Sequence, residues 1–268
     1  MSSQKKKLNS VKTSPLKSAV YIIGAGPGDP ELLTVKAQKI ISSADVILYA
    51  DSLVPKEILA TAKPEAELIP TGNKTLEEII PIAIARVKEN LSVVRLHSGD
   101  LSLYSAIREQ IAALTAAEIE FELIPGISAY QAAAAKLKAE LTVPGLVQTI
   151  ILTRISGSAS KVPEKEELAT LAAHQASLCL YLAARHIETA TEKLLQHYPP
   201  DTPVAICYRL SWPDEKIWVV PLKNIAAKTR QEKLIRTTLY LISPALKDNI
   251  SNTRSRLYHP QHSHLFRP

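Results

Sequence analysis

Short apolar runs alternate with helical patterns along nearly the whole chain, from Ser18 to about Leu246. In the first half, the runs predict strands at 19–23, 45–49, 66–69, 92–97 and 120–124. Between them, the helical patterns lie at 31–43, 54–62, 75–90 and 102–116. Such alternation is typical of a parallel sheet with helices on both faces. We therefore predict an α/β fold whose first domain contains a parallel sheet.

The second half has the same alternation with one difference. Strands are expected at 147–153, 177–182, 203–208, 216–220 and 238–242, and helices at 128–138, 164–174, 186–197 and 222–228. Only Leu210–Glu215 separate two of these strands, which indicates an antiparallel hairpin and so a mixed sheet. The change of domain is predicted at Pro125-Gly126, giving domains 18–125 and 126–246 with tails at 1–17 and 247–268.

A glycine-rich turn, Gly24-Ala25-Gly26-Pro27-Gly28-Asp29-Pro30, follows the first predicted strand. A dinucleotide-binding turn would have its third glycine where Asp29 stands. The two prolines each remove an N–H donor, and Asp29 adds negative charge where a phosphate would lie. A second turn, Ser98-Gly99-Asp100, is also acidic. These loops favour a cationic ligand over a polyphosphate.

The glycines are concentrated at strand ends. Gly24, Gly26 and Gly28 follow the first predicted strand, Gly99 follows the fourth and Gly126 follows the fifth. Ligands of open α/β sheets bind beyond the carboxyl ends of the strands. Five of the eight glycines would therefore line one crevice, where the backbone comes close to something.

The net charge of +6 lies in the two tails, because residues 1–17 hold five lysines and no acid, and residues 247–268 add three net positive charges. The body between them has a net charge of −2, which argues against a nucleic-acid-binding face, and the tails are predicted to be disordered. Cys179 and Cys207 lie in apolar runs and are expected to be buried thiols. No apolar stretch approaches the roughly 18 residues of a membrane span, so we predict a cytoplasmic protein without a membrane partner.

Several residues near strand ends have both a structural and a functional interpretation. Asp100 or Ser102 would be the N-cap of one helix, and Ser128 would be the N-cap of another. For Asp51, a helix cap and a role in a site are equally frequent interpretations. His97 closes a strand and is more often structural than a catalytic base. The chain contains no hydrolase nucleophile motif, kinase phosphate loop or metal-ligand spacing.

The segments 20–34 (VYIIGAGPGDPELLT), 98–100 (SGD) and 125–129 (PGISA) resemble the tetrapyrrole (corrin/porphyrin) methylase superfamily. The resemblance covers nearly all of the chain between the tails. It implies S-adenosyl-L-methionine as methyl donor, whose cationic sulfonium agrees with acidic loops, in a cleft between two α/β domains. It also implies a homodimer.

Within that superfamily the resemblance is closest to the precorrin-4 C11-methyltransferases of cobalamin biosynthesis. It rests on segments 49–54 (YADSLV), 95–110, 148–154 and, above all, 208–216 (YRLSWPDEK). Two residues depart from the pattern: Leu101 replaces a usual proline, and Asp51 stands where many of these enzymes have glycine. Methylases of the same fold that act on uroporphyrinogen III, RNA or diphthamide are the alternative.

The resemblance also implies which residues contact the cofactor: Pro27, Ser98, Gly99, Asp100, Leu103, Ser128, Ala129, Leu182 and Leu210. For the catalytic site the sequence offers candidates only, namely Asp51, Arg108 and Arg209. We expect Arg108, Arg209 and also Arg154 to pair with carboxylates of the tetrapyrrole substrate, since arginine gives bidentate contacts; for each, a surface ion pair is the alternative. No metal site is expected, and whether the substrate carries cobalt is left open.

Overall fold

The computed structural model of the chain describes residues 16–157, 161–247 and 263. The chain divides into two compact units, Met1–Ile127 and Ser128–Pro268. The division lies close after the predicted boundary at Pro125-Gly126. Most of the two predicted disordered tails lies outside the described residues.

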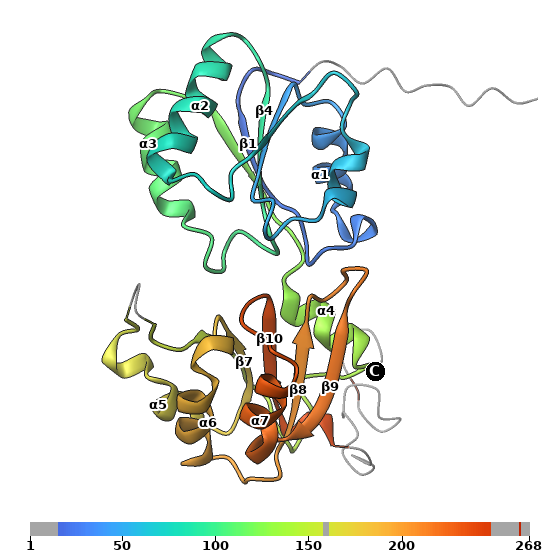
Figure 1. The fold of residues 1–268 in the computed structure, drawn as a ribbon, viewed down its shortest axis with the longest axis vertical. Coiled ribbons are helices and arrows are strands. Elements are labelled where there is room, and N and C mark those ends of the chain that lie inside the picture. Colours follow the sequence, from blue (N-terminus) through green and yellow to red (C-terminus); the bar gives the residue numbers. More distant parts are fainter. Residues whose placement is uncertain (1–15, 158–160, 248–262, 264–268) are drawn as a thin grey trace, which may run out of the picture. The chain divides into compact units, whose positions relative to one another are not determined.

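The first unit contains a five-stranded sheet in the order β3-β2-β4-β1-β5, with every neighbouring pair parallel. Its strands are β1 (Val20–Gly24), β2 (Val46–Tyr49), β3 (Glu67–Pro70), β4 (Val93–His97) and β5 (Phe121–Ile124). Helix α1 (Val35–Ile41) covers one face, and α2 (Leu76–Lys88) and α3 (Ile107–Ala116) cover the other (Figure 1). The predicted parallel sheet with helices on both faces is confirmed.

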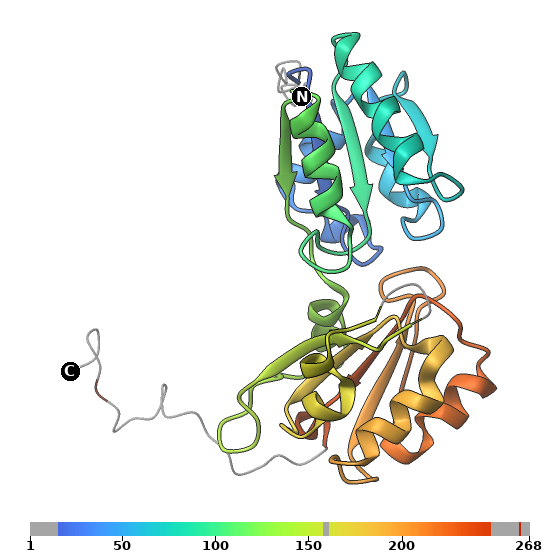
Figure 2. The ribbon, with the colours of Figure 1, turned by 90° about the vertical axis from the view of Figure 1, so that its left-hand side faces the viewer.

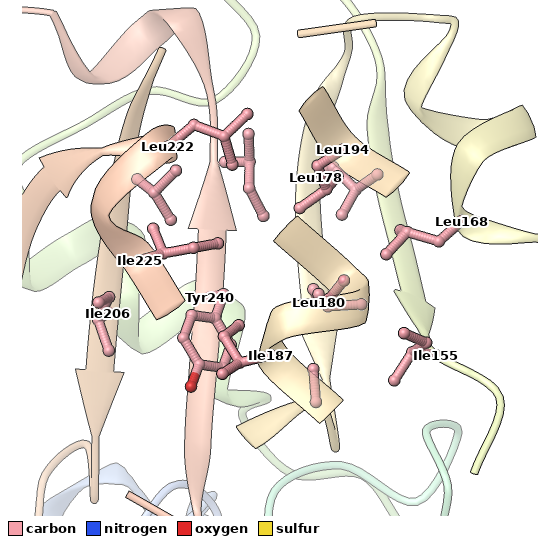
Figure 3. Close-up of a cluster of buried hydrophobic side chains, with 14 of the residues drawn as sticks. Ile155, Leu168, Leu178, Leu180, Ile187, Leu194, Ile206, Leu222, Ile225 and Tyr240 are labelled. Atoms are coloured by element: carbon pink, nitrogen blue, oxygen red, sulfur yellow. The ribbon is translucent and has the colours of Figure 1, made fainter. Parts of the chain in front are cut away.

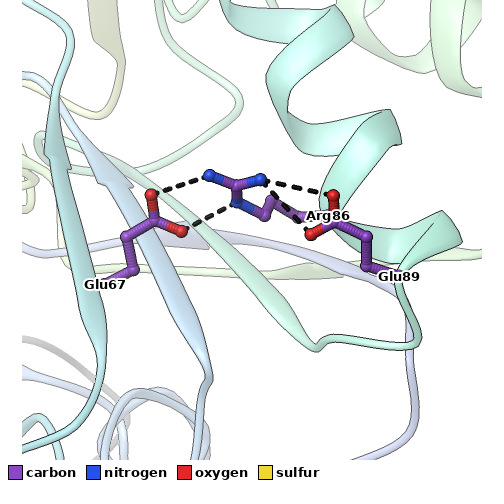
Figure 4. A network of polar contacts seen from close by, with 3 residues as sticks. All are labelled: Glu67, Arg86 and Glu89. Atoms are coloured by element: carbon purple, nitrogen blue, oxygen red, sulfur yellow. Dashed lines mark hydrogen bonds and ion pairs between the residues drawn. The ribbon is translucent and has the colours of Figure 1, made fainter.

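An ion-pair network joins α2 to the edge strand β3 (Figure 4). Arg86 donates from Nε and Nη2 to the two carboxylate oxygens of Glu67 at 2.8 and 2.9 Å, and it also contacts Glu89. All three side chains are partly exposed to solvent, so screening by water keeps the contribution of this network to stability small.

The second unit has a mixed sheet in the order β6-β7-β10-β8-β9. Its strands are β6 (Ile150–Arg154), β7 (Ser177–Tyr181), β8 (Pro203–Tyr208), β9 (Lys216–Pro221) and β10 (Thr238–Ile242). Only β6 and β7 pair in parallel, and β8 and β9 form the predicted antiparallel hairpin. The mixed sheet is therefore confirmed.

Helices cover both faces of this second sheet. Figures 1 and 2 show α5 (Leu168–Ala172), α6 (Ile187–Leu195) and α7 (Ile225–Gln231) on one face and α4 (Ala129–Lys136) on the other. In the core under α6 and α7, Leu194 and Ile225 belong to one buried cluster with strand residues such as Leu178 and Tyr240 (Figure 3). The Tyr240 hydroxyl lies 3.0 Å from Thr229 Oγ1, so the one polar atom of this buried ring has a partner.

Short 3₁₀ segments replace or extend several predicted helices. They lie at Pro30–Leu32, Lys56–Thr61, Glu164–Glu166, Ala184–His186, Leu222–Asn224 and Pro244–Leu246. The predicted helix at 54–62 is therefore a 3₁₀ helix, and the one at 31–43 is divided between Pro30–Leu32 and α1.

The prediction of a helix beginning at residue 102 is wrong, and so is the prediction that Asp100 or Ser102 caps it. Helix α3 begins at Ile107, after Ala106 as N-cap. Tyr104 and Ala106 both have left-handed backbone angles, with φ of 53° and 51°, which interrupts a helix before Ile107. The carboxylate of Asp100 instead accepts the N–H of Ser102 at 2.9 Å in a tight turn.

Candidate functional site

Three loops meet at the carboxyl edge of the first sheet. The loop after β1 pairs with the loop after β4, because Gly26 donates to the carbonyl of Gly99 at 3.1 Å and Gly99 donates back to Gly26 at 2.7 Å. Ala25 adds a third bond, to the carbonyl of His97 at 2.7 Å. The loops that carry the acidic turns are therefore one hydrogen-bonded structure.

Two glycines are needed where these loops touch. A Cβ atom on Gly24 would lie 2.6 Å from the carbonyl oxygen of Gly99, and one on Gly126 would lie 2.3 Å from the same oxygen. Both distances are shorter than any side-chain carbon tolerates. The sequence predicts that the backbone at these glycines comes close to another group. At Gly24 and Gly126, that group is the backbone of a neighbouring loop.

Asp100 fastens the loop after β4 to the loop after β5. Its Oδ2 accepts the N–H of Gly126 at 3.0 Å, and its Oδ1 accepts the N–H and the hydroxyl of Ser102. Burial would raise the pKa of Asp100, but these hydrogen bonds outweigh it, so the pKa lies below its usual value. The side chain is ionised at neutral pH and leaves a half-buried negative charge at this edge.

The other acidic and basic groups near these loops have structural roles. Asp29 caps the 3₁₀ helix Pro30–Leu32 by accepting the N–H of Glu31 at 2.9 Å. His97 Nε2 lies 3.4 Å from the buried Gln110 of α3. Burial, with a smaller contribution from the charge of Arg95, lowers the pKa of His97 to about 4. A neutral, hydrogen-bonded ring agrees with the structural interpretation of this histidine.

The remaining predicted cofactor residues of the first unit differ in exposure. Pro27 is buried, Ser98 is exposed, and Leu103 is half-buried. Each lies in the loop after β1 or the loop after β4, as expected. Their contact with a cofactor stays a prediction.

In the second unit, Ser128 caps α4, as the sequence predicts. The side chain of Gln131 accepts the N–H of Ser128 at 2.9 Å, and the Ser128 hydroxyl lies 2.9 Å from the hydroxyl of Tyr181 at the end of β7. Ala129 is the first residue of α4 and is half-buried. This network joins the start of α4 to the carboxyl end of β7.

Leu182 follows β7 directly and is 66% exposed, although it is a large apolar side chain. Its backbone is left-handed, with φ of 55°, which is unfavourable for leucine. Leu210 after β8 is buried, and it lies between Arg209 and Ser211, whose φ angles are 48° and 64°. Such strain is frequent at ligand sites, and here it falls on one predicted cofactor residue, Leu182, and on both neighbours of another, Leu210.

The candidate catalytic residues are held in different ways. Arg209 donates to Asp214 at 2.6 Å and stacks over Trp212, with 4.0 Å from its guanidinium carbon to the ring centre. In the structure, Arg209 therefore forms an ion pair with Asp214, which is the alternative interpretation given above. Asp51 caps no helix, and its Oδ1 accepts the N–H of Gly72 at 2.8 Å.

The two remaining arginines also lie at element ends. Arg108 is exposed in the first turn of α3. Arg154 ends β6 and donates to the carbonyls of Ile155 and Lys161, each at 3.3 Å. Their pairing with substrate carboxylates stays a prediction.

Sequence reasoning missed one charged residue whose side chain reaches this edge, Arg95 in the middle of β4. It is 8% exposed, and its Nη1 donates to Thr71 Oγ1 at 2.8 Å. The available signal was a lone arginine within the apolar run that forms β4, because strands of a parallel sheet are buried on both faces.

Other features of the described residues lie apart from these loops. Cys179 and Cys207 are free and buried, as predicted, and burial raises the pKa of each to about 12. A cavity of about 490 Å³ in the second unit is lined by residues such as Gln148 and His174, which precede β6 and β7. It therefore lies at the amino ends of those strands, away from the predicted cofactor residues.

Two kinds of feature are absent from the described part of the chain. Within residues 16–157, 161–247 and 263, no three His, Cys, Asp or Glu side chains gather as metal ligands would. No described helix has both the length and the apolar composition needed to cross a bilayer.

The chain is similar to proteins of known kinds over most of its length. The family described as Tetrapyrrole (Corrin/Porphyrin) Methylases matches residues 19–226. A cobalt-precorrin-4 C(11)-methyltransferase of Methanocaldococcus jannaschii is 44% identical, over 92% of this chain and 95% of that protein. An S-adenosyl-L-methionine-dependent uroporphyrinogen III methyltransferase of Methanosarcina barkeri is 36% identical, over 80% of this chain and 87% of that protein.

A solved structure is also similar. The X-ray structure of a cobalamin biosynthetic enzyme, cobalt precorrin-4 methyltransferase, matches with a TM-score of 0.83 at 40% identity. The match covers 86% of this chain and 97% of that one.

Proposed function

Because this chain belongs to the tetrapyrrole methylase family, we propose that it transfers the methyl group of S-adenosyl-L-methionine to C11 of precorrin-4 or of its cobalt complex. The observation that carries the proposal is the graded similarity to relatives. The C11-methyltransferase is more similar to this chain than the uroporphyrinogen III methyltransferase is, and it matches more of the chain.

The residues of the first unit fit the methyl donor that the family uses. The donor carries a sulfonium and an ammonium cation, and Asp100 supplies an ionised carboxylate at the loop edge. The loop after β1 has prolines at 27 and 30, so it is short of the N–H donors that a phosphate would need. We infer that Pro27, Ser98, Gly99, Asp100 and Leu103 contact the donor.

The residues of the second unit fit a different part of the same molecule. Leu182 presents an exposed apolar side chain, and Leu210 is held between two strained residues. Apolar side chains of this kind suit the adenosine part of the donor. We infer that Ser128, Ala129, Leu182 and Leu210 complete the contacts.

The proposed reaction needs little covalent chemistry from the protein. The bond from methyl carbon to sulfur breaks, the sulfur keeps the electron pair, and the acceptor carbon forms the new bond. Because the donor is already activated, holding the two reactants in line supplies most of the acceleration, which is worth up to roughly 7–11 kcal/mol in well-oriented systems. Asp51 stays a candidate for the catalytic site.

The finer expectations from the sequence belong to the same proposal. We infer that the protein is a homodimer in the cytoplasm, that it binds no nucleic acid, and that Arg108, Arg154 and Arg209 hold substrate carboxylates. The negative net charge between the tails supports the absence of a nucleic-acid partner. Sedimentation analysis tests the dimer directly.

The reaction is tested by incubating the protein with methyl-labelled S-adenosylmethionine and one acceptor at a time. The acceptors are precorrin-4, cobalt-precorrin-4 and uroporphyrinogen III, and the readout is the product mass. One methyl group added to either form of precorrin-4 supports the proposal and identifies the acceptor. Methylation of uroporphyrinogen III alone would overturn the C11 assignment within the same family.

A further inference from the structure

Arg95 is a buried cation in the middle of β4, and its side chain reaches the carboxyl edge of the first sheet. It lies on β4 between Leu48 of β2 and Ile22 of β1. Its guanidinium extends across β2 to Thr71, the first residue after β3. Only 8% of its surface is exposed. Among the buried polar residues in the described part of the chain, Arg95 is the only one that carries a charge.

The charge of Arg95 has no counter-charge among the described residues. None of their ion pairs includes it, and its Nε is buried without a hydrogen-bond partner. Arg86 makes the contrast clear, because it is more exposed and yet contacts two carboxylates (Figure 4). A buried, unpaired charge is costly, and folded proteins normally pair it.

The neighbours of Arg95 do not neutralise it. The Oγ1 atom of Thr71 donates to the carbonyl of Tyr49 at 3.0 Å, so its oxygen offers Arg95 only a neutral acceptor. On the same face of β4, His97 is neutral at pH 7. Burial lowers the pKa of Arg95 only to about 10, so the guanidinium keeps its charge.

A structural role alone does not need this residue type. A neutral donor would make the single bond to Thr71, and it would avoid burying a charge. The arginine fork instead suits a carboxylate, which accepts two parallel N–H bonds. The buried guanidinium lacks a counter-charge and further hydrogen-bond acceptors, and a ligand with a carboxylate would supply both.

We propose that Arg95 binds a carboxylate of the bound ligand at the carboxyl edge of β4. The inference rests on the proposed function, which supplies two sources of carboxylate. The tetrapyrrole acceptor carries acetate and propionate side chains, and the methyl donor carries one carboxylate on its methionine part. Both offer the same chemistry, and the experiment separates them.

The test compares Arg95→Gln with Arg95→Lys and with the control Thr71→Val, which removes the bond to Arg95 but keeps its charge. Thermal melting first establishes that each variant is folded. The Kd values of S-adenosylhomocysteine and of methylthioadenosine, which lacks the carboxylate, are then measured by calorimetry. The KM for precorrin-4 or cobalt-precorrin-4, whichever the wild type methylates, is measured in parallel.

If the carboxylate belongs to the acceptor, Arg95→Gln raises KM by about tenfold or more and leaves both Kd values unchanged. If it belongs to the donor, the same variant weakens S-adenosylhomocysteine but not methylthioadenosine. In either case Arg95→Lys gives a smaller loss, because it keeps the charge without the fork, and Thr71→Val stays within about twofold of the wild type. A folded Arg95→Gln with unchanged KM and Kd values overturns the proposal.

A measurement on the wild type keeps the test decisive if Arg95→Gln does not fold. The Nε–H resonance of Arg95 is assigned by its absence from the Arg95→Lys spectrum, and it should shift when S-adenosylhomocysteine or the acceptor is added. A resonance that moves with neither ligand overturns the proposal. Failure of the proposed function looks different, because the wild type would then methylate neither form of precorrin-4.

Discussion

Asp100 Oδ2 accepts the backbone N–H of Gly126 at 3.0 Å, and this bond connects the loops after β4 and β5 across the end of β1. The same carboxylate also holds Ser102. One side chain therefore fixes the geometry of two predicted cofactor loops, in addition to supplying their negative charge.

Asp100→Asn should loosen both loops, because an amide nitrogen in place of one carboxylate oxygen would face an N–H donor. We expect a loss of about 1–3 kcal/mol in unfolding free energy and weaker binding of S-adenosylhomocysteine. Urea denaturation and calorimetry measure the two effects. Unchanged values of both would show that the carboxylate has neither role.

Gly126→Ala should destabilise the first unit strongly. The new Cβ would lie 2.3 Å from the carbonyl of Gly99, and relieving this contact requires movement of the backbone. Overpacking of this kind costs about 1–3 kcal/mol or more. Gly157→Ala is the matched control, since its Cβ would have an ordinary 3.6 Å contact to His186. Equal melting temperatures for the two variants would contradict the loop packing described here.

Asp45, which lies far from the candidate site, should make part of the stability of the fold depend on acid pH. Burial would raise its pKa, but hydrogen bonds from Lys63 and Ser92 outweigh it and lower the pKa to about 2. Since the folded pKa lies below the unfolded value, the stabilisation is complete above about pH 4 and is lost as the pH falls towards about 2.

For this partly exposed side chain we expect about 1–2 kcal/mol, after allowance for solvent screening. Urea denaturation of the wild type and of Asp45→Asn between pH 2 and 7 measures it. The difference between the two proteins should shrink towards low pH, and a constant difference would contradict the assignment.

Arg209→Ala should raise KM for the tetrapyrrole and leave the Kd of S-adenosylhomocysteine unchanged, because the proposed role is in acceptor binding. In the structure Arg209 is paired with Asp214, so Asp214→Asn makes the guanidinium more available. That variant should lower KM or leave it unchanged. If Arg209→Ala weakens both ligands together, the residue acts on the whole loop and the substrate role is wrong.

The sequence predicted the strands well because each is a short, mainly apolar run with a turn at its end, whether it is buried like β4 or largely exposed like β3. It also predicted the cap at Ser128, where residue type and position agree. It did not predict the late start of α3, since the left-handed residues Tyr104 and Ala106 are not of the types that normally adopt that conformation. Local propensity carries no signal for such a feature.

The candidate site was predicted in outline, and its contacts were not. Glycine at 24 and 126 indicates that a side chain would not fit, but it does not say what occupies the space. Similarly, the sequence around Arg95 does not reveal whether its guanidinium has a counter-charge in the folded protein. Only the folded chain shows that Thr71 is its side-chain partner among the described residues.

The two hydrogen bonds between Gly26 and Gly99 have a dynamic consequence. The amide of each glycine donates to the carbonyl of the other, so neither amide can be exposed to solvent without breaking a hydrogen bond between the two loops. The two amides should therefore exchange with solvent through a shared opening event, with one free energy, even though they lie on loops far apart in the sequence. The acidic edge of the first sheet would then open and close as a single cooperative unit.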